Sequence, residues 1–351
     1  MRKYEQYRDD ARGMTAGLCI LLAVSVVGTI VFSAIAMAGV TVAAAYGYLT
    51  NMTEMELPAG YWEGVFQQRL IQSAVVTVLA VLGTAIYRTW QLSDGGGRWV
   101  ARAMGGTRVL QTGETDASRV KLMNVVEELA VATGLRTPSV YVLENEPGIN
   151  AFAAGLDDKD AVVGVTRGAI EKLKRHQLQG VVAHEFSHIA HGDMRLNVRL
   201  MGILAGIQAI ATAANFLLRL AMPNPDANGR VSKHPLGMVL AFLFGAALWP
   251  IGRIGSLFAM LIHLAVNRQR EFLADASAVQ YTRDPIGLCE ALQVLLEEEE
   301  GSRVRGPGLQ FASHMFFASG RGTWERLFAT HPPLQERIRR LEPAVATAGC
   351  P

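Results

Sequence analysis

VVAHEFSHIAHGD, residues 181–193, is the stretch that decides the fold, because it carries the pattern HExxH from His184 to His188. Residues four apart lie on one face of a helix, so both imidazoles can reach a single metal ion. Glu185 lies about 100° round the helix from His184, where a carboxylate can accept a proton from an attacking water. A chance match in a chain of this length has a probability of about 1%. The stretch therefore predicts a metal site with a general base beside it.

The opposite face of the same helix is apolar. Val182, Phe186 and Ile189 fall on that face, which predicts that the helix is anchored in a hydrophobic core. Gly192 is suited to end the helix, with His191 beside it. The alternative interpretation, two ordinary histidines on a helix, does not account for a metal face backed by a packing face.

A catalytic zinc site of this kind uses three protein ligands and keeps one position open. His191 is one candidate for the third ligand, because it shares a face with the HExxH histidines. The longer pattern HExxHxxGxxH fails, however, since position 191 is His and position 194 is Met. The favoured candidate is Glu271 in NRQREFLADA, residues 267–276, where Asp275 would hold a ligand histidine by its second ring nitrogen. The alternative for these two carboxylates is a solvated acidic helix face.

Composition argues against a nucleic-acid-binding protein, a soluble protein and a disulfide-rich protein. The chain has 351 residues and a net charge of +2, so it lacks the basic excess of a nucleic-acid-binding protein. Half of its residues are hydrophobic, which is high for a soluble protein. The cysteines Cys19, Cys289 and Cys350 form no CxxC pair, which argues against a disulfide framework and favours a reducing compartment.

Uncharged runs long enough to cross a bilayer interrupt the chain. A membrane helix needs about 20 apolar residues, and the first run is too long for a signal peptide. Each shorter run alone is also compatible with a buried core helix, but the four together predict an integral membrane protein. The runs cover residues 13–53, 70–87, 200–218, and 234–252 continued by 254–267 after Arg253.

The distribution of charged residues predicts the orientation of these segments. The loop between the first two runs is acidic, with Glu54, Glu56 and Glu63. Basic residues favour the cytoplasmic side of a membrane. We therefore expect the N-terminus and the catalytic domain to be cytoplasmic, at a bacterial inner membrane. The basic residues before the first run and after the second are Arg2, Lys3, Arg8, Arg12, Arg88, Arg98 and Arg102.

Residues between the membrane runs show patterns of both helix and strand. Apolar spacing predicts a helix over 116–133, with Gly134 as its C-cap. Thr166 is predicted to cap a helix that contains residues 169–173. The segment Ser-Asp-Gly-Gly-Gly at 93–97 predicts a flexible joint. Strands are predicted at 139–143, 149–153 and 161–165.

Four blocks of the chain resemble the HtpX-type membrane zinc endopeptidases, relatives of the CAAX prenyl proteases and the Oma-type mitochondrial proteases. The order of the blocks fits, as do two leading membrane segments and a hairpin between the motifs. HEFSH alone is moderately specific, whereas the four blocks together are a strong signal. They are NAFAAG at 150–155, HEFSHIAHGD at 184–193, RQREFLADASA at 268–278 and THPPLQERIRRL at 330–341.

The resemblance implies roles for particular residues. His184, His188 and Glu271 would be the ligands of one zinc ion per chain, and Glu185 the general base. His331 would lie near the site and stabilise the oxyanion of the transition state; the alternative is an ordinary histidine before a helix that begins with proline. The substrate would pair through main-chain hydrogen bonds with an edge strand formed by Asn150, Ala151, Phe152 and Ala153.

The expected fold class is α+β: a mainly helical zincin (gluzincin) catalytic domain with a small β-sheet, plus four transmembrane helices. Glu271 follows Glu185 by 86 residues, and these residues include two membrane runs. A hairpin that crosses a membrane twice returns to the side it left, so it can bring the third ligand back to the HExxH helix. The expected domains are an N-terminal transmembrane hairpin and joint at 1–97, the first part of the protease domain at 98–194, a second transmembrane hairpin at 195–267, and the helical C-terminal part of the protease domain at 268–351.

The expected function is zinc-dependent hydrolysis of peptide bonds in membrane-protein quality control. The partners would be polypeptide substrates, above all misfolded membrane proteins, together with the lipid bilayer and without nucleic acid. A non-proteolytic metal-binding scaffold or regulator is the alternative, although a purely structural site needs no base at Glu185. Processing of prenylated CAAX substrates is disfavoured, because four membrane segments are too few for the large chamber of those relatives.

Overall fold

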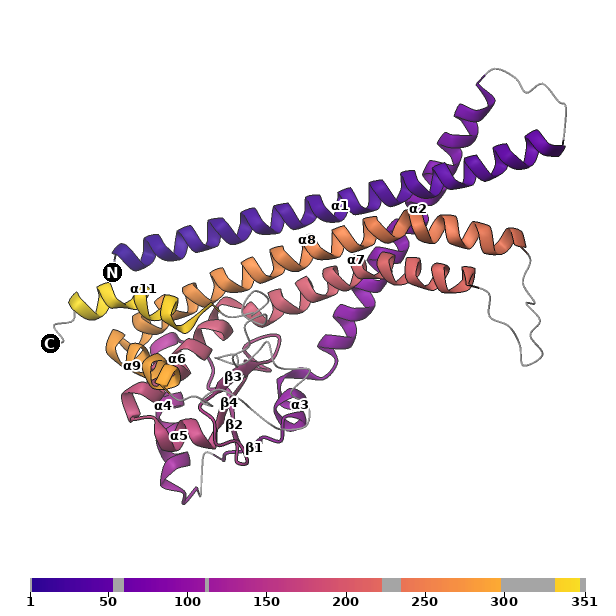
Figure 1. Ribbon diagram of the computed structural model, residues 1–351. Coiled ribbons are helices and arrows are strands. Elements are labelled where there is room, and N and C mark those ends of the chain that lie inside the picture. The colour runs from indigo at the N-terminus through magenta and orange to yellow at the C-terminus, as the bar shows by residue number, and fades with distance from the viewer. Residues whose placement is uncertain (1, 53–59, 111–113, 223–234, 298–331, 348–351) are drawn as a thin grey trace. The chain divides into compact units, whose positions relative to one another are not determined.

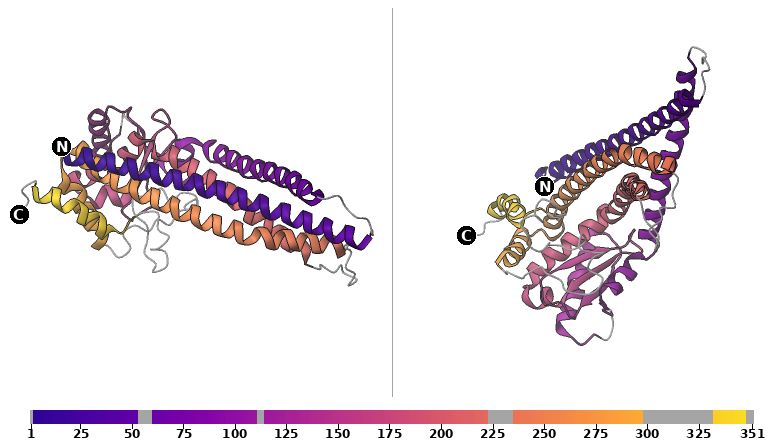
Figure 2. Two further views of the ribbon diagram at one scale, coloured as in Figure 1. Left: turned by 90° about the horizontal axis from the view of Figure 1, so that it is seen from above. Right: turned by 45° about the vertical axis from the view of Figure 1, so that its right-hand side comes forward.

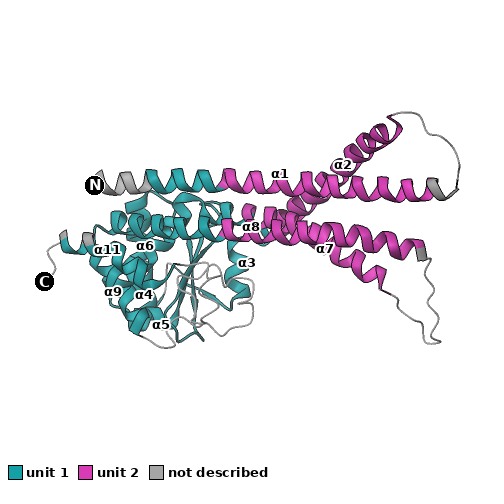
Figure 3. Ribbon diagram, turned by 45° about the horizontal axis from the view of Figure 1, so that its top comes forward, with its two compact units in different colours: residues 1–18, 92–198, 264–351 teal, residues 19–91, 199–263 magenta. Residues whose placement is uncertain are grey.

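The computed structural model describes residues 2–52, 60–110, 114–222, 235–297 and 332–347. The chain forms two compact units, each built from segments that are distant in the sequence (Figure 3). Unit 1 comprises residues 1–18, 92–198 and 264–351, and unit 2 comprises residues 19–91 and 199–263. The chain therefore leaves unit 1 and returns to it twice.

Unit 2 is built from long apolar helices. Among the described residues, four helices are long and apolar enough to cross a membrane. Their apolar spans, 9–49, 61–93, 193–221 and 236–282, contain the second and third uncharged runs and nearly all described residues of the first and fourth, so the predicted membrane segments are confirmed in length and composition. The helices are α1 (Arg2–Met52), α2 (Tyr61–Ser93), α7 (Asp193–Ala221) and α8 (Pro235–Thr282).

Glycines let the helices of unit 2 approach one another closely. A Cβ atom at Gly252 of α8 would lie 2.6 Å from the backbone nitrogen of Ala211 in α7. A Cβ atom at Gly206 of α7 would lie 2.6 Å from a carbonyl oxygen of α2. Small residues are common contacts between membrane helices, because helices surrounded by lipid associate through close packing. Arg253, the charge that interrupts the fourth run, is exposed and lies over the ring of Trp249 at 5.6 Å from its centroid.

Unit 1 contains a small mixed sheet with the strand order β1-β2-β4-β3. β2 runs parallel to β4, whereas β1 pairs antiparallel with β2, and β3 pairs antiparallel with β4. β3 is therefore an edge strand of the described sheet. The strands predicted at 139–143, 149–153 and 161–165 correspond to β2, β3 and β4. The bounds are β1 (Thr107–Arg108), β2 (Ser139–Leu143), β3 (Ala151–Ala154) and β4 (Val162–Thr166).

The two faces of the sheet pack against different helices (Figure 1 and Figure 2), because side chains alternate along each strand. Val163 and Ala153 belong to the main core with α4 and α6, whereas Phe152 and Tyr141 pack on the α3 side. Gly164 leaves room for the Phe152 ring, since a Cβ atom there would lie 2.0 Å from it. This mainly helical α+β arrangement confirms the expected fold class. The helices of unit 1 introduced so far are α3 (Gly96–Ala103), α4 (Ala117–Thr133) and α6 (Arg175–His191).

Local signals set the ends of these helices. Asp116 begins α4 by accepting a hydrogen bond from the amide of Ser118 at 2.8 Å, and Gly134 ends it in a left-handed conformation. Thr166 accepts a hydrogen bond from the first turn of α5 (Arg167–Lys172) at 3.3 Å. Gly192, with φ of 66°, ends α6 after His191. The predicted caps of all three helices are confirmed.

The predicted flexible joint at 93–97 is wrong for its last two glycines. α2 ends at Ser93, and α3 begins at Gly96. Gly97 is buried and donates its N–H to Oδ2 of Asp160 at 2.8 Å, while a Cβ atom on Gly97 would lie 2.6 Å from the carbonyl oxygen of Asp160. Glycine here permits close packing of α3 against the sheet, and composition alone does not distinguish this role from flexibility.

The HExxH helix α6 crosses α9 (Pro285–Glu297) with a glycine on each side. A Cβ atom at Gly180 would lie 2.6 Å from the backbone nitrogen of Leu288, and one at Gly287 would lie 2.5 Å from the carbonyl oxygen of His176. Backbone atoms of the two helices therefore meet directly. This contact fixes α6 against the helix that follows the segment with Glu271.

Gly180→Val is expected to lower the free energy of unfolding by about 1–3 kcal/mol, because the added side chain meets backbone and not a flexible side chain. The midpoint of thermal unfolding of the detergent-solubilised protein measures this effect. Gln179→Val is the matched control, since it adds the same side chain at a half-exposed neighbouring position of α6. Equal midpoints for the two variants would contradict the close crossing.

Candidate metal centre

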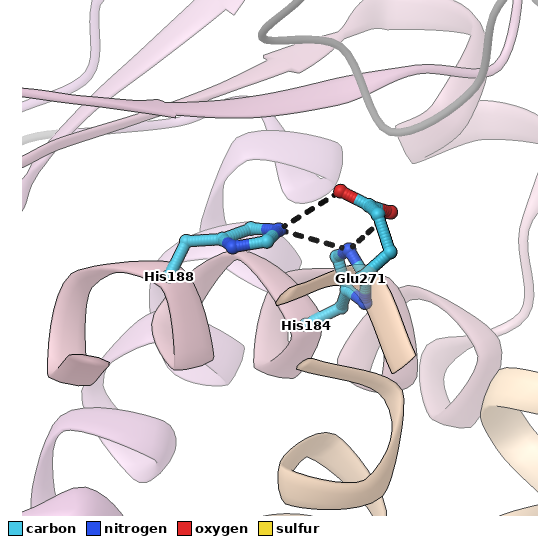
Figure 4. A group of neighbouring side chains, drawn as sticks. All are labelled: His184, His188 and Glu271. Atoms are coloured by element: carbon cyan, nitrogen blue, oxygen red, sulfur yellow. Dashed lines mark hydrogen bonds and ion pairs between the residues drawn. The ribbon is translucent and has the colours of Figure 1, made fainter. Parts of the chain in front are cut away.

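In unit 1, helix α6 and the C-terminal part of α8 bring the predicted site residues together. α6 carries His184, Glu185 and His188, and α8 carries Glu271 and Asp275. Four of these side chains are buried, with His184 fully enclosed and His188 partly exposed. The rings of the histidines and the carboxylate of Glu271 point toward one another from the two helices (Figure 4). The apolar back of α6 is buried in the main core, as its sequence predicts: Val182, Phe186 and Ile189.

Two imidazoles and one carboxylate turn their ligand atoms toward one another. Nε2 of His184 and Nε2 of His188 are 3.1 Å apart. Each of these nitrogens lies 3.5 Å from an oxygen of Glu271. Among the described residues, His184, His188 and Glu271 form a group able to hold a metal ion.

The second nitrogen of each imidazole is held by a carboxylate. Nδ1 of His184 lies 2.9 Å from Oδ1 of Asp275. Nδ1 of His188 lies 2.7 Å from Oδ2 of Asp193, the first residue of α7. A carboxylate accepts a hydrogen bond, so each Nδ1 carries the proton and each Nε2 presents a lone pair. The sequence predicted the Asp275 contact and missed Asp193, although Asp193 lies within the quoted motif.

The geometry fits a tetrahedral metal ion. With metal–ligand bonds of about 2.0–2.1 Å, the ligand atoms of a tetrahedral zinc site are about 3.3 Å apart. Here the two Nε2 atoms are 3.1 Å apart, and each lies 3.5 Å from its nearest oxygen of Glu271, which is Oε2 for His184 and Oε1 for His188. Two lone pairs 3.1 Å apart repel each other unless a proton or a metal ion lies between them. The donor set of two imidazoles and one carboxylate is one that zinc accepts.

Electrostatics at the site also favour a cation. Burial opposes protonation of both imidazoles, but the surrounding carboxylates outweigh it and raise the pKa of His184 and, more strongly, that of His188. With neutral imidazoles, two guanidiniums face four carboxylates, which leaves a charge of −2 that a divalent cation would balance. The carboxylates are Glu185, Asp193, Glu271 and Asp275, and the guanidiniums are Arg270 and Arg337.

Arg337 of α11 (Leu334–Thr347) is a site residue that the sequence reasoning missed. Its side chain is fully buried and donates from Nε and Nη2 to the two oxygens of Asp275, at 2.9 and 2.6 Å. Nη1 lies 3.6 Å from Glu271. Burial opposes its charge, but Asp275 and Glu271 raise the pKa of Arg337, so it remains a guanidinium. It thereby fixes the carboxylate that holds His184.

Contacts of α11 place this arginine. Ile338 and Leu341 join the main core, and the guanidinium of Arg340 lies 3.6 Å from the ring centroid of Phe272 in α8. Arg337 occupies the same apolar face as Leu334 and Leu341, since residues three and four apart are neighbours on a helix. The available signal in the sequence was a charged residue at a position where the apolar periodicity of the helix predicts a buried side chain.

Not all predicted site residues lie in the metal group. His191 bonds through Nδ1 to the carbonyl oxygen and the hydroxyl of Ser187, at 2.9 and 3.0 Å, and it is absent from the group among the described residues. His331 lies outside the described residues. Asn150 directly precedes β3, which begins at Ala151, and its Oδ1 accepts the N–H of Ala151 at 3.0 Å.

Comparison with known proteins identifies the family of this chain. Residues 116–345 match the model of peptidase family M48. The chain is 38% identical over 221 residues to a protease HtpX homolog of Thermoanaerobacter pseudethanolicus, covering 63% of this chain and 71% of that one. It is 40% identical over 222 residues to a protease HtpX homolog of Caldanaerobacter subterraneus subsp. tengcongensis, with the same coverage.

A solved structure is also similar. The crystal structure of S. mikatae Ste24p aligns with a TM-score of 0.43 and 17% identity, covering 79% of this chain and 65% of that chain. The family assignment rests on the match to the family model and on the HtpX homologues. Each alignment with these homologues covers 63% of this chain and 71% of the homologue. With its candidate membrane helices and its His-His-Glu group, this chain belongs to peptidase family M48.

Proposed function

We propose that the protein is a zinc-dependent integral-membrane endopeptidase. The observation that carries the proposal is the convergence of His184, His188 and Glu271, with ligand atoms 3.1–3.5 Å apart. These three residues would hold one zinc ion. Zinc bound there would polarise the scissile carbonyl and lower the pKa of the attacking water.

Glu185 is the residue that moves the proton. It is buried and follows His184 directly on α6, so a water attacking beside the ligands lies within reach of its carboxylate. The water oxygen forms a bond to the carbonyl carbon, and the water proton passes to Glu185. The C–N bond then breaks, and Glu185 delivers that proton to the leaving amine. His331 is proposed to donate a hydrogen bond to the oxyanion.

The edge strand β3 would bind the substrate in extended form. Thr166 donates its N–H to the carbonyl of Asn150, so the hydrogen-bonded pairs with β4 fall at 150, 152 and 154. The main-chain groups of Ala151 and Ala153 therefore point away from β4, toward the edge of the described sheet. Because Asn150 already accepts the N–H of Ala151, the groups for substrate pairing are the carbonyl of Ala151 and both groups of Ala153.

The substrate class we propose is polypeptide, above all misfolded membrane proteins cut on the cytoplasmic side of a bacterial inner membrane. The candidate membrane spans and the acidic loop between the first two of them support this orientation. Cells that carry an inactive variant are then expected to accumulate damaged membrane proteins. Comparative proteomics of their membrane fraction tests this role.

A metal-holding scaffold without proteolysis is the alternative. Its site would need ligands but no carboxylate beside them, whereas Glu185 stands next to His184. The scaffold predicts stoichiometric zinc binding by the wild-type protein without cleavage of any polypeptide. Measuring both properties on one preparation separates the two functions.

Removal of zinc is expected to abolish casein cleavage by the full chain in detergent, because the ligand group then lacks its ion. Stoichiometric zinc should restore the cleavage.

Glu271→Gln is expected to lower zinc affinity about 10-fold or more, since a neutral amide replaces a charged ligand. Cleavage that persists after chelation, or in Glu271→Gln protein that holds no zinc, would contradict a zinc mechanism.

A further inference from the structure

Asp193 lies between a proposed ligand histidine and an arginine. Its Oδ2 is 2.7 Å from Nδ1 of His188, and its Oδ1 accepts a hydrogen bond from Nε of Arg270. Both carboxylate oxygens are therefore engaged. The two side chains are largely buried, with 11% of Asp193 and 12% of Arg270 exposed.

Arg270 joins three helices of unit 1 at this point. It precedes Glu271 on α8, and its Nη2 also lies 3.3 Å from the carbonyl oxygen of His191, the last residue of α6. Asp193 is the first residue of α7. One guanidinium thus binds the end of the HExxH helix and the beginning of the next helix. It does so from the helix that supplies the third proposed ligand.

The arrangement repeats the contacts around the other histidine. His184 is held by Asp275, and Asp275 is held by Arg337. His188 is held by Asp193, and Asp193 is held by Arg270. A carboxylate that holds a ligand imidazole fixes its ring orientation and raises its basicity, provided that the carboxylate itself cannot rotate away. In each case, the arginine removes that freedom.

We propose that Asp193 and Arg270 are positioning residues, which hold Nε2 of His188 toward the metal and thereby set the affinity for zinc. The proposal rests on the zinc site described under the proposed function. Neither residue touches the reacting atoms, because Asp193 lies behind the ring of His188 and Arg270 lies behind Asp193. The same ion pair also connects α7 with α8, so a purely structural role is the competing explanation.

Zinc affinity separates positioning from a structural role. Asp193→Ala in the full-length chain is expected to lower zinc affinity about 10- to 100-fold, as is typical when a carboxylate behind a ligand histidine is lost. Arg270→Ala should give a smaller loss, because the carboxylate remains but can rotate. The double variant should bind zinc no more weakly than Asp193→Ala alone, since Arg270 acts through Asp193. Competition with a chromophoric chelator measures the zinc affinity of all three variants.

A spectroscopic measurement tests directly whether Asp193 sets the orientation of His188. With Co²⁺ in place of zinc, the visible absorption of the bound ion reports the ligand geometry, and Asp193→Ala should change this spectrum. Asp193→Asn keeps the size of the side chain and serves if the alanine variant does not fold; it should weaken zinc binding by the loss of charge. Arg270→Lys should recover part of the affinity lost in Arg270→Ala.

Arg175→Ala is the matched control, because Arg175 forms an exposed ion pair with Glu128 elsewhere in unit 1. Its zinc affinity should equal that of the wild type. Wild-type affinity and an unchanged Co²⁺ spectrum in folded Asp193→Ala or Asp193→Asn would overturn the proposal, as would additive losses in the double variant. Failure of the wild-type protein to bind zinc would instead overturn the proposed function.

Discussion

Glu185→Gln is expected to reduce the kcat/KM of peptide cleavage about 10²- to 10⁴-fold, which is the usual contribution of a general base. Glutamine has nearly the size of glutamate and fits the same buried position on α6. It cannot accept a proton at neutral pH, so the attacking water stays protonated and the leaving amine receives no proton. Casein cleavage by purified wild type and variant measures the effect.

Zinc content should not change in this variant. Glu185 does not belong to the metal group, whose members are His184, His188 and Glu271. Glu171→Gln is the control, because it removes an exposed carboxylate that pairs with Arg167 on α5; its activity should equal that of the wild type. Robust proteolysis by a zinc-loaded Glu185→Gln protein would refute the role of Glu185.

The parts of the fold that sequence alone predicts depend on short-range patterns. Membrane runs are recognisable because a charge inside a bilayer is costly, so the absence of charge over 13–53 has one strong explanation. The C-terminal ends of α4 and α6 were predicted from Gly134 and Gly192, which adopt the positive φ that glycine favours. The metal pair is visible because helical geometry relates His184 to His188.

The parts that the sequence does not predict depend on tertiary packing. Arg337 differs from its neighbours Arg339 and Arg340 only by lying on the apolar face of its helix, and the sequence does not show that this face buries it against Asp275. Asp193 is equally ambiguous, because an aspartate at the start of a helix is usually a cap. Its role becomes clear only when α8 returns and places Arg270 beside it. The fold therefore identifies Asp193 and the two arginines, whereas Asp275 was predicted from its spacing to Glu271.

Arg337→Met is expected to destabilise the protein by about 3–5 kcal/mol, because removal of one partner leaves the buried carboxylate of Asp275 without its cation. Methionine fills much of the arginine volume, so the loss arises from charge more than from a cavity. Zinc affinity should also fall, since Asp275 is then free to turn away from His184. Thermal unfolding in detergent and chelator competition measure the two effects.

A second substitution separates the stability effect from the metal effect. In the double variant Asp275→Asn with Arg337→Met, neither member of the pair is charged, so much of the lost stability should return. Zinc affinity should remain low, because a neutral amide holds His184 less strongly than a carboxylate does. Arg339→Met on the same helix is the control; Arg339 is 72% exposed, and its replacement should leave both quantities nearly unchanged. If the double variant were no more stable than Arg337→Met, the buried ion pair would not be the source of the loss, and the inferred role of Arg337 would have to be abandoned.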